Sequence, residues 1–456
     1  MNLILITIDC LRADHLNSLA YSKKTTPNLD YLASTGVFFN QAISVSTWTP
    51  SSFIAMFTST YPLMYGGQVY ATNSRTAIAQ VLKEHGYYTG AFHSNPWLSS
   101  YYGYNKGFNT FDDSMQERGN KRRLDDLAQL VKSKIGTNGR LYKLLSAIYG
   151  SHVEQLPFIK AEALNRKAIS WVRSNPNNFF LWIHYMDLHE PYIANLKIIS
   201  PSERRRIMKL SDKAFIEQSS LSQEEIKELI YLYDTQLIYV DRHIGSILQV
   251  LEQRDITENT FVIVTADHGQ QFAEHGYVGH SVHLYDELIH VPLIVSGPGL
   301  ASQVINQQVS LLDLAPTILD MLKIEKHKAF LGNSLVPLIS GDRAEAGNLE
   351  AISEGDITKK PVWDLHDLPR LDVNHKQISL RTGEWKYIYT EGGEDELYRL
   401  EDDPNETRDI IDIEPEIATH FRARIMAHIE FEDKSTPSEE ELIKAKIGKL
   451  KSSGRL

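Results

Sequence analysis

Three side chains that suit a divalent cation stand directly after apolar, strand-like runs of the sequence. Asp9 follows the run LILITI, and the adjacent Asp267 and His268 follow FVIVTA. Two carboxylates and one imidazole are hard or borderline ligands for Mn²⁺, Ca²⁺, Mg²⁺ or Zn²⁺. A cation held there would polarise an anionic ester and lower the pKa of an adjacent alcohol. These residues therefore predict a site for one divalent metal ion.

An alcohol that such an ion would activate lies in the stretch STWTPSSFIAMFTSTYP, residues 46–62. Thr49 stands where an N-cap belongs, Pro50 suits the first helical position, and apolar residues then recur at helical spacing. The free N–H groups and positive dipole of a helix N-terminus favour anions. Two interpretations of Thr49 remain open at this point. It is either a helix cap or a nucleophile aimed at a sulfuryl or phosphoryl group.

Two further segments carry histidines that suit an ester-hydrolysing site. The segment WIHYMDLHEPY contains His184 and Asp187, candidates for substrate binding, and His189, which suits protonation of a leaving group. A histidine inside a strand is often a satisfied core residue, whereas His189 precedes Glu-Pro in a predicted loop, where functional residues concentrate. The Gly-flanked segment GYVGHSVHLYDELIH adds His280 and His283 as alternative contacts to the substrate.

The segments that position these residues alternate between strand-like and helical patterns. Near-continuous apolar runs such as NNFFLWIHYMD and NTFVIVTADHG are separated by amphipathic helical stretches. This alternation predicts an α/β fold with a largely parallel central sheet and helices on both faces. Ligands of such sheets gather at the carboxyl ends of the strands, where the acidic and histidine clusters fall.

We expect a catalytic α/β domain over residues 1–345 and a small α+β subdomain with a short antiparallel sheet over 346–456. Two charged, helical segments without strand signals, at about 113–170 and 195–230, are predicted insertions that build a lid. The subdomain is indicated by short strand patterns separated by Gly-Gly and Pro-Asn turns, followed by a helix from about 415 to 431.

Composition narrows the class of protein. The chain has 456 residues, 42% of them hydrophobic, and a formal net charge of -11, which argues against nucleic-acid binding. The single cysteine, Cys10, forms no intrachain disulfide, which fits a reducing compartment. The start MNLILITIDC indicates a strand instead of a signal peptide, and no apolar run is long enough for a transmembrane helix. We therefore expect a cytoplasmic protein without a membrane span.

Six segments of the chain resemble, in the same order, the sulfatase family of the alkaline phosphatase superfamily: NLILITIDCLRADHL, TPSSFIAMFTSTYP, HYMDLHEPY, TADHGQQFAEHG, LYDELIHVPLIVSGPG and LRTGEWKYIY with ELYRLEDDPNE. The resemblance runs from residue 2 to about 420. It implies an alkaline-phosphatase-like sheet, a smaller C-terminal domain with a short antiparallel sheet, and one metal ion, for which the family suggests Ca²⁺ or Mg²⁺.

The resemblance also implies roles for individual residues, with three metal ligands at Asp9, Asp267 and His268. Thr49 falls at the position of the family nucleophile, and there its hydroxyl would also contact the metal. His189 matches the family histidine before proline. Either His280 or His283 occupies the place of a family Lys or His that contacts the substrate.

The chain departs from the family pattern at four positions. Sulfatases oxidise a Cys or Ser to formylglycine, but Thr49 has a β-methyl group that excludes this oxidation. Phe53 replaces the Arg of the same motif, and Cys10 stands where many members have a second metal-binding Asp. The family segment Gly-Lys-Trp-His is replaced by FHSNPW, in which Asn95 would donate a hydrogen bond to an ester oxygen. The pocket thus keeps its metal and loses positive charge.

The sequence therefore predicts a metal-dependent hydrolase of anionic esters that acts on phosphodiesters through a covalent phospho-threonine at Thr49. Glycan-linked esters are among the candidate substrates. Sulfate and phosphonate esters are further candidate substrates. Three alternatives remain open: an arylsulfatase-like sulfate ester hydrolase, a transferase that moves a phospho-substituent onto a glycan, and a non-catalytic glycan-binding descendant. No oligomeric state is predicted.

Overall fold

The computed structural model describes the chain except for residues 67–70, 72–73, 115–157, 176, 194–199, 217–219, 281–282, 343–349, 357–375 and 436–456. Most of the first predicted insertion lies outside the described residues. The second contains α7 (Pro201–Ile216) and the start of the long helix α8 (Gln223–Gln253). Its role as a lid stays a prediction.

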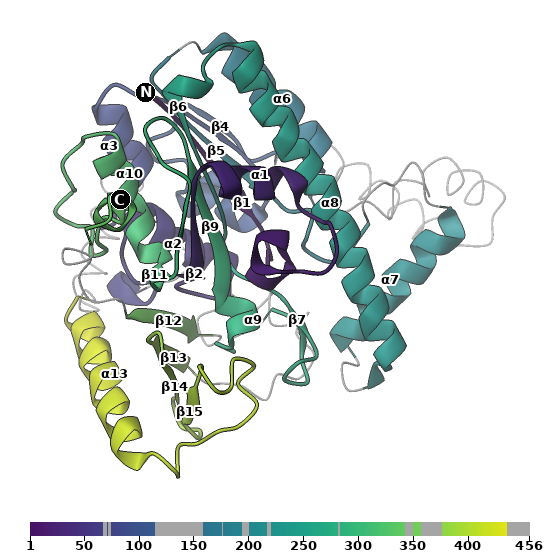
Figure 1. Cartoon of the computed structure of the whole chain (residues 1–456), viewed down its shortest axis with the longest axis vertical. Coiled ribbons are helices and arrows are strands. Elements are labelled where there is room, and N and C mark those ends of the chain that lie inside the picture. The colour runs from purple at the N-terminus through teal and green to yellow at the C-terminus, as the bar shows by residue number, and fades with distance from the viewer. Residues whose placement is uncertain are drawn as a thin grey trace, which may run out of the picture.

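The centre of the molecule is a mixed, mostly parallel sheet of nine strands in the order β10-β2-β9-β6-β1-β5-β3-β4, with β11 also paired to β2 (Figure 1). This confirms the predicted fold class. The central strands β1, β5 and β6 are buried along their whole length, which explains their near-continuous apolar sequences. The strands span Asn2–Ile8 (β1), Val37–Ile43 (β2), Tyr88–Phe92 (β3), Thr110–Asp112 (β4), Phe179–Tyr185 (β5), Thr260–Ala266 (β6), His290–Ser296 (β9), Gln303–Ile305 (β10) and Val309–Ser310 (β11).

Helices pack around this sheet in two groups. One group joins α1, α6 and α8, and the other joins α2, α3 and α10. The remaining bounds are Pro27–Thr35 (α1), Thr49–Thr58 (α2), Ile78–Glu84 (α3), Ala161–Ser174 (α6), Asp286–Ile289 (α9), Leu314–Met321 (α10) and Val336–Ile339 (α11). The helix α2, which carries Thr49, is buried at every position.

A second, four-stranded antiparallel sheet follows in the order β12-β13-β14-β15 and packs against the long helix α13. Its own apolar core joins the sheet to α13 through residues such as Tyr387 and Phe421. The predicted small α+β unit is therefore present, below the main sheet in Figure 1. The elements span Ala351–Asp356 (β12), Lys376–Arg381 (β13), Trp385–Thr390 (β14), Glu396–Arg399 (β15) and Pro415–Ser435 (α13).

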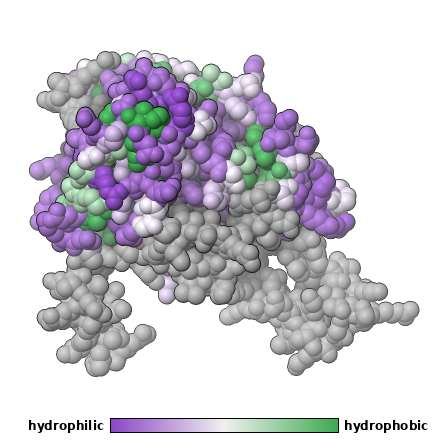
Figure 2. Space-filling view, turned by 90° about the horizontal axis from the view of Figure 1, so that it is seen from below, coloured by the Kyte–Doolittle hydropathy of each residue, from purple (hydrophilic) through white to green (hydrophobic). Residues whose placement is uncertain are grey.

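No helix in the described part of the chain is both long and apolar enough to cross a membrane. The face of the molecule seen in Figure 2 is mostly hydrophilic where it is described, with small separate apolar patches. This distribution agrees with the net charge of -11.

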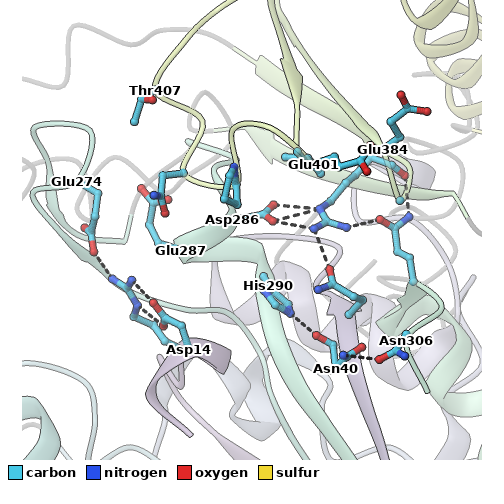
Figure 3. A pocket seen from close by; sticks show the side chains of 18 residues that line it. Asp14, Asn40, Glu274, Asp286, Glu287, His290, Asn306, Glu384, Glu401 and Thr407 are labelled. Carbon is cyan, nitrogen blue, oxygen red and sulfur yellow. Dashed lines mark hydrogen bonds and ion pairs between the residues drawn. The ribbon is translucent and has the colours of Figure 1, made fainter. Parts of the chain in front are cut away.

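A buried ion network joins the second sheet to the main domain. Asp286 of α9, labelled in Figure 3, accepts hydrogen bonds from Arg381 of β13, at 2.8 Å from Nη2, and from Lys386 of β14, at 2.9 Å from Nζ. Lys386 is completely buried and also pairs with Glu406 at 2.6 Å. Arg381 and Lys386 lower the pKa of Asp286 against the effect of burial, so its carboxylate stays ionised.

We expect Asp286→Ala to lower the free energy of unfolding by about 3–5 kcal/mol, because it leaves two buried cations without their shared anion. Glu384→Ala is the matched control, since it removes an exposed carboxylate 3.0 Å from Arg399 and should cost less than about 1 kcal/mol. Urea unfolding followed by circular dichroism measures both. Equal costs for the two variants would show that this network does not hold the subdomain in place.

Candidate active site

Strand pairing places the predicted metal ligands side by side. Strand β1 pairs in parallel with β6, with Ile8 opposite Ala266, so the next residues, Asp9 and Asp267, leave the sheet at the same edge. One potential ligand atom from each of Asp9, Asp267 and His268 lies within 4.8 Å of the others, and all three residues are completely buried. The sequence prediction of a three-residue cluster is confirmed in its geometry.

The Thr49 hydroxyl faces this cluster. Its Oγ1 lies 3.4 Å from Asp9 Oδ2 and 3.3 Å from His268 Nε2. The interpretation of Thr49 as an N-cap is wrong, because Trp48 occupies the cap position and Thr49 is already the first helical residue. The backbone turn at Trp48 directs the Thr49 side chain to the acidic cluster instead of to the free N–H groups of the helix.

The two buried carboxylates respond differently to their surroundings. Burial alone would raise the pKa of Asp9, but His184 and then His189 lower it well below its usual range. Burial and the charge of Asp9 raise the pKa of Asp267. Asp267 Oδ2 is buried and accepts no hydrogen bond from any described residue. A divalent cation fits this donor set, because it would satisfy that oxygen and compensate the paired carboxylates.

His184 supports the cluster from the neighbouring strand. The register of β5 against β1 pairs it with Thr7, whose Oγ1 lies 3.0 Å from His184 Nδ1. The other ring nitrogen, Nε2, lies 3.4 Å from Asp9 Oδ2. His184 is completely buried, so the structure assigns it the positioning of Asp9 and not the contact with substrate that its motif suggested.

Two more imidazoles continue from the cluster toward solvent. The ring centroid of His280 is 4.5 Å from that of His268 and 5.0 Å from that of His189. His189 donates from Nδ1 to the Glu190 carbonyl at 2.9 Å, and its side chain is 29% exposed, which leaves Nε2 as the nitrogen for proton transfer. Burial opposes protonation, but Glu190 and Asp9 raise the pKa of His189 above 6.5. A protonated His189 suits general-acid catalysis.

The structure places three other candidates outside this arrangement. His283 packs its ring 4.3 Å from that of Tyr277, and burial lowers its pKa to about 4. His280 is therefore the histidine of this loop that reaches the cluster, and the alternative assignment to His283 is not supported.

The predicted substrate contacts of Asp187 and Asn95 are also not supported. Asp187 accepts hydrogen bonds from the Ala161 N–H, 3.0 Å from Oδ2, which begins α6, and it is paired with Lys160 at 3.4 Å. Asn95 accepts from the Trp97 N–H at 2.9 Å as the cap of the short 3-10 helix η4 (Pro96–Leu98). Both side chains have local structural tasks that their motifs did not indicate.

The sequence analysis missed residues that help to position the clustered side chains without being candidate ligands themselves. Gln270 lies beside His280, with Oε1 3.3 Å from Nδ1, and donates from Nε2 to Tyr192 Oη at 2.8 Å. Its place directly after the Asp-His-Gly turn was an available signal. Gly269 is required there because a Cβ atom would lie 2.1 Å from the Glu287 carbonyl oxygen.

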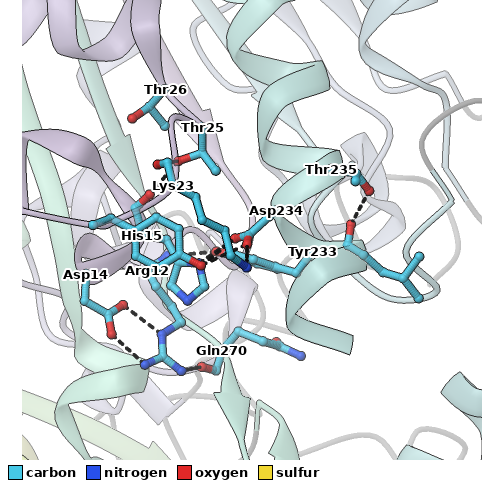
Figure 4. Close-up of polar contacts among 12 residues, drawn as sticks. Arg12, Asp14, His15, Lys23, Thr25, Thr26, Tyr233, Asp234, Thr235 and Gln270 are labelled. Atoms are coloured by element: carbon cyan, nitrogen blue, oxygen red, sulfur yellow. Dashed lines mark hydrogen bonds and ion pairs between the residues drawn. The ribbon is translucent and has the colours of Figure 1, made fainter. Parts of the chain in front are cut away.

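Hydrogen bonds also hold the other side of the loop that follows β1. Arg12 donates to Asp14 and to the Gln270 carbonyl, and His15 Nδ1 lies 2.9 Å from Asp234 Oδ1 of α8 (Figure 4). Tyr233 of α8 donates to the Cys10 carbonyl at 2.8 Å. These bonds fix the backbone that carries Asp9, so the cluster is preorganised.

A large cavity lies elsewhere. It has a volume of about 960 Å³ and opens between the main domain and the second sheet, where Asp286 and Glu384 line it (Figure 3). None of the clustered residues Asp9, Thr49, Asp267 and His268 lines this cavity. We place the candidate site at the cluster, because potential ligand atoms, the Thr49 hydroxyl and the imidazoles of His189 and His280 lie together there.

Comparison with known families shows to which protein family the chain belongs. Residues 1–324 match the sulfatase family model, and residues 273–430 match the model of the N-sulphoglucosamine sulphohydrolase C-terminal region. The chain belongs to the sulfatase family.

Individual sulfatase relatives are distant. Arylsulfatase K of Mus musculus is 30% identical over 214 residues, which cover 46% of this chain and 37% of that protein. The Homo sapiens Arylsulfatase K is 30% identical over the same length, with 46% and 38% covered. The match thus spans less than two fifths of either relative.

Solved structures share the fold over nearly the whole chain. The phosphonate monoester hydrolase of Agrobacterium radiobacter has a TM-score of 0.70 at 19% identity, with 94% of this chain and 96% of that one covered. BT4656, solved in complex with its substrate D-glucosamine-2-N,6-O-disulfate, has a TM-score of 0.71 at 16% identity, with 96% and 99% covered. At these identities the likeness shows the fold alone.

Two departures from the sulfatase pattern alter the surroundings of Thr49. Phe53 is completely buried and packs its ring 4.9 Å from His184 and 5.0 Å from Trp182, so an aromatic core fills the place of the motif Arg. Cys10 is buried, and its Sγ donates to Asp9 Oδ1 at 2.8 Å. Burial and then Asp9 raise the pKa of Cys10, so it remains a neutral thiol beside the cluster.

We expect Asp267→Asn to lower the metal content of the purified protein severalfold and the activity by several orders of magnitude, because a charged ligand becomes neutral. Asp187→Asn is the matched control, since it changes a buried carboxylate outside the cluster and should leave the metal content unchanged. Elemental analysis of both proteins, together with circular dichroism, measures this. Wild-type metal content in Asp267→Asn would remove this residue from the ligand set.

Proposed function

We propose that this sulfatase-family chain is a metal-dependent hydrolase of phosphodiester or phosphonate monoester bonds, with Thr49 as the nucleophile. The observation that carries the proposal is the contact of the Thr49 hydroxyl with two of the proposed metal ligands, 3.4 Å from Asp9 Oδ2 and 3.3 Å from His268 Nε2. Thr49 is also the first residue of helix α2, whose N-terminal N–H groups favour an anionic ester. Nucleophile and anion site therefore coincide.

The chemistry of threonine favours phosphorus over sulfur. A sulfated formylglycine decomposes by elimination from its second hydroxyl group, and threonine has no such group. Water resolves a phospho-threonine by direct attack on phosphorus, which needs no second hydroxyl. The activity of a structural neighbour, the phosphonate monoester hydrolase of Agrobacterium radiobacter, agrees with this preference.

Each residue has one task in the proposed reaction. Asp9, Asp267 and His268 would hold a divalent cation, which polarises the ester and lowers the pKa of the Thr49 hydroxyl when it is bound. Thr49 Oγ1 bonds to phosphorus while the ester bond breaks, and His189 gives its Nε2 proton to the leaving oxygen. Deprotonated His189 then activates the water that releases a phosphate monoester, from a phosphodiester substrate, or a phosphonate, from a phosphonate monoester, and regenerates the Thr49 hydroxyl.

Hydrolysis of sulfate esters is the second candidate, favoured by the sequence similarity to Arylsulfatase K. Transfer of a phospho-substituent onto a glycan would use the same covalent step, with an acceptor alcohol in place of water. Turnover in the absence of any acceptor separates hydrolase from transferase. A glycan-binding protein without catalysis would have no use for a complete set of ligands and a nucleophile.

We expect Thr49→Ala to lose phosphodiesterase turnover by more than a thousandfold and Thr49→Ser to keep part of it, because only alanine lacks the attacking oxygen. Thr58→Ala is the matched control: its hydroxyl bonds only within α2 and the adjacent turn, to Ile54 O and Thr60. Steady-state kinetics with bis(4-nitrophenyl) phosphate on metal-loaded proteins measures the rates.

A rate of Thr49→Ala within tenfold of wild type would contradict the nucleophile assignment. The loss of a helix-end contact costs only about 1 kcal/mol of stability and leaves chemistry intact, so a structural role predicts that outcome.

We expect His189→Ala to slow the hydrolysis of alkyl esters at least tenfold more than that of 4-nitrophenyl esters, because a general acid matters most when the leaving oxygen is basic. His283→Ala should change both rates equally, since that imidazole lies outside the cluster. Values of kcat across a leaving-group series measure this difference. An equal loss across the series in His189→Ala would make the residue a positioning group.

A further inference from the structure

A second group of potential metal ligands lies between the second sheet and helix α13, which run side by side in Figure 1. One ligand atom from each of Glu354, His428 and Glu432 lies within 4.8 Å of the others, and all three residues are buried. We call these three residues the α13 triad. Its donor set, two carboxylates and one imidazole, is the same as that of the cluster beside Thr49.

Secondary structure brings the side chains of the α13 triad together. Glu354 lies opposite Ile378 in the register of β12 against β13, and Ile378 belongs to the apolar core that the sheet shares with α13. The Glu354 side chain therefore points to the helix. His428 and Glu432 are four residues apart on α13, so they lie on the same helix face. Helical zinc motifs use the same spacing for two of their ligands.

The distances between the ligand atoms suit a small tetrahedral ion. His428 Nε2 lies 2.7 Å from Glu354 Oε1 and 3.8 Å from Glu432 Oε2. Zinc–ligand bonds of about 2.0–2.2 Å in tetrahedral geometry place two ligand atoms about 3.3–3.6 Å apart, between these two values. The other oxygen of Glu354, Oε2, accepts from the Leu63 N–H at 3.0 Å, and such outer hydrogen bonds orient the carboxylates of metal sites. Calcium, by contrast, takes about six to eight oxygen ligands.

The charges in the α13 triad also suit a divalent cation. Lys376 lies 3.7 Å from Glu432 Oε2. Even so, burial raises the pKa of Glu354, and burial together with Glu354 raises the pKa of Glu432 to about 9. A proton shared by the two carboxylates compensates one charge, whereas a divalent cation compensates both. Burial lowers the pKa of His428, which keeps its imidazole in the neutral form that binds metal ions.

We propose that the α13 triad binds a structural zinc ion, held by Glu354, His428 and Glu432 with water in the remaining position. The ion would fasten the C-terminal helix to the segment that leads into α2. Glu354 makes this connection through its backbone, because its N–H donates to Val45 O at 2.7 Å and its carbonyl oxygen accepts from Ser46 Oγ at 2.7 Å. The proposed role is structural, so it does not depend on the reaction proposed above.

The test counts zinc in proteins whose first cluster has been disabled. Asp267→Asn and the double variant Asp267→Asn/Glu432→Gln are stripped with a chelator, incubated with Zn²⁺, desalted and submitted to elemental analysis and circular dichroism. We expect about one more zinc ion per chain in the single variant than in the double variant, because glutamine keeps the shape of the side chain and removes its charge. Asp267→Asn/Glu430→Gln is the matched control. Glu430 is an exposed carboxylate of the same helix that pairs with Lys434, and its loss should leave the zinc content unchanged.

Thermal unfolding provides a second readout, because a ligand that binds only the folded chain stabilises it. Zn²⁺ should raise the Tm of Asp267→Asn by several degrees. Adding His428→Ala should abolish this gain, and adding His420→Ala, which changes an exposed histidine of α13, should keep it.

Zinc contents and Tm gains that are equal with and without Glu432→Gln and His428→Ala would overturn the proposal, since the bound zinc would then be adventitious. Failure of Asp267→Asn to bind zinc would overturn it as well, and would leave the α13 triad as two carboxylates that share a proton. None of these measurements uses turnover, so they remain decisive even if the proposed function is wrong.

Discussion

The parallel pairing of β1 with β6 is the constraint on which the site depends. It brings Asp9 and Asp267 out of the sheet side by side, with no exposed surface on either. Two carboxylates so placed repel each other in a medium of low polarity, and burial alone would raise the pKa of both, although only the pKa of Asp267 lies above its usual value. The surrounding imidazoles compensate part of this charge. A divalent cation held by Asp9, Asp267 and His268 would complete the compensation and would link folding of the sheet to the chemistry of the site.

The second sheet also helps to hold the cluster in place, although it lies farther from it in the structure. Asp286 of α9 is held by Arg381 and Lys386 of the C-terminal sheet, and the segment around α9 bonds to the ligand loop. The Gly269 N–H donates to Leu288 O at 2.7 Å, in a contact too close for any residue with a side chain. The subdomain thus supports the loop that carries the cluster, in part through this short helix, without contributing a ligand to the cluster among the described residues.

The sequence predicted the fold and the metal cluster because both follow from local patterns. A buried parallel strand has a continuous apolar sequence. Polar residues such as Asp9 follow at its carboxyl end, where they lie close to the polar residues that follow neighbouring strands. The interpretation of Thr49 as an N-cap was wrong, because the position of the cap depends on the backbone conformation of a single residue, here Trp48, which the sequence pattern does not fix. His283 and Asp187 lie only a few residues from His280 and His189 in the sequence, and tertiary packing alone places their side chains away from the cluster. Gln270 and Tyr233 act through contacts that no local pattern reveals.

The central claim is that the phosphoryl or phosphonyl group of the substrate is transferred to Thr49. Detection of this covalent intermediate tests the claim most directly. Metal-loaded wild type is mixed with a phosphonate monoester bearing a good leaving group, quenched in acid within the first turnover, digested and analysed by mass spectrometry. The account predicts a phosphonyl group on the peptide that contains Thr49, and its loss at the rate of turnover. Turnover with an unmodified Thr49 peptide at every time point, or with the group on another residue, would contradict the account.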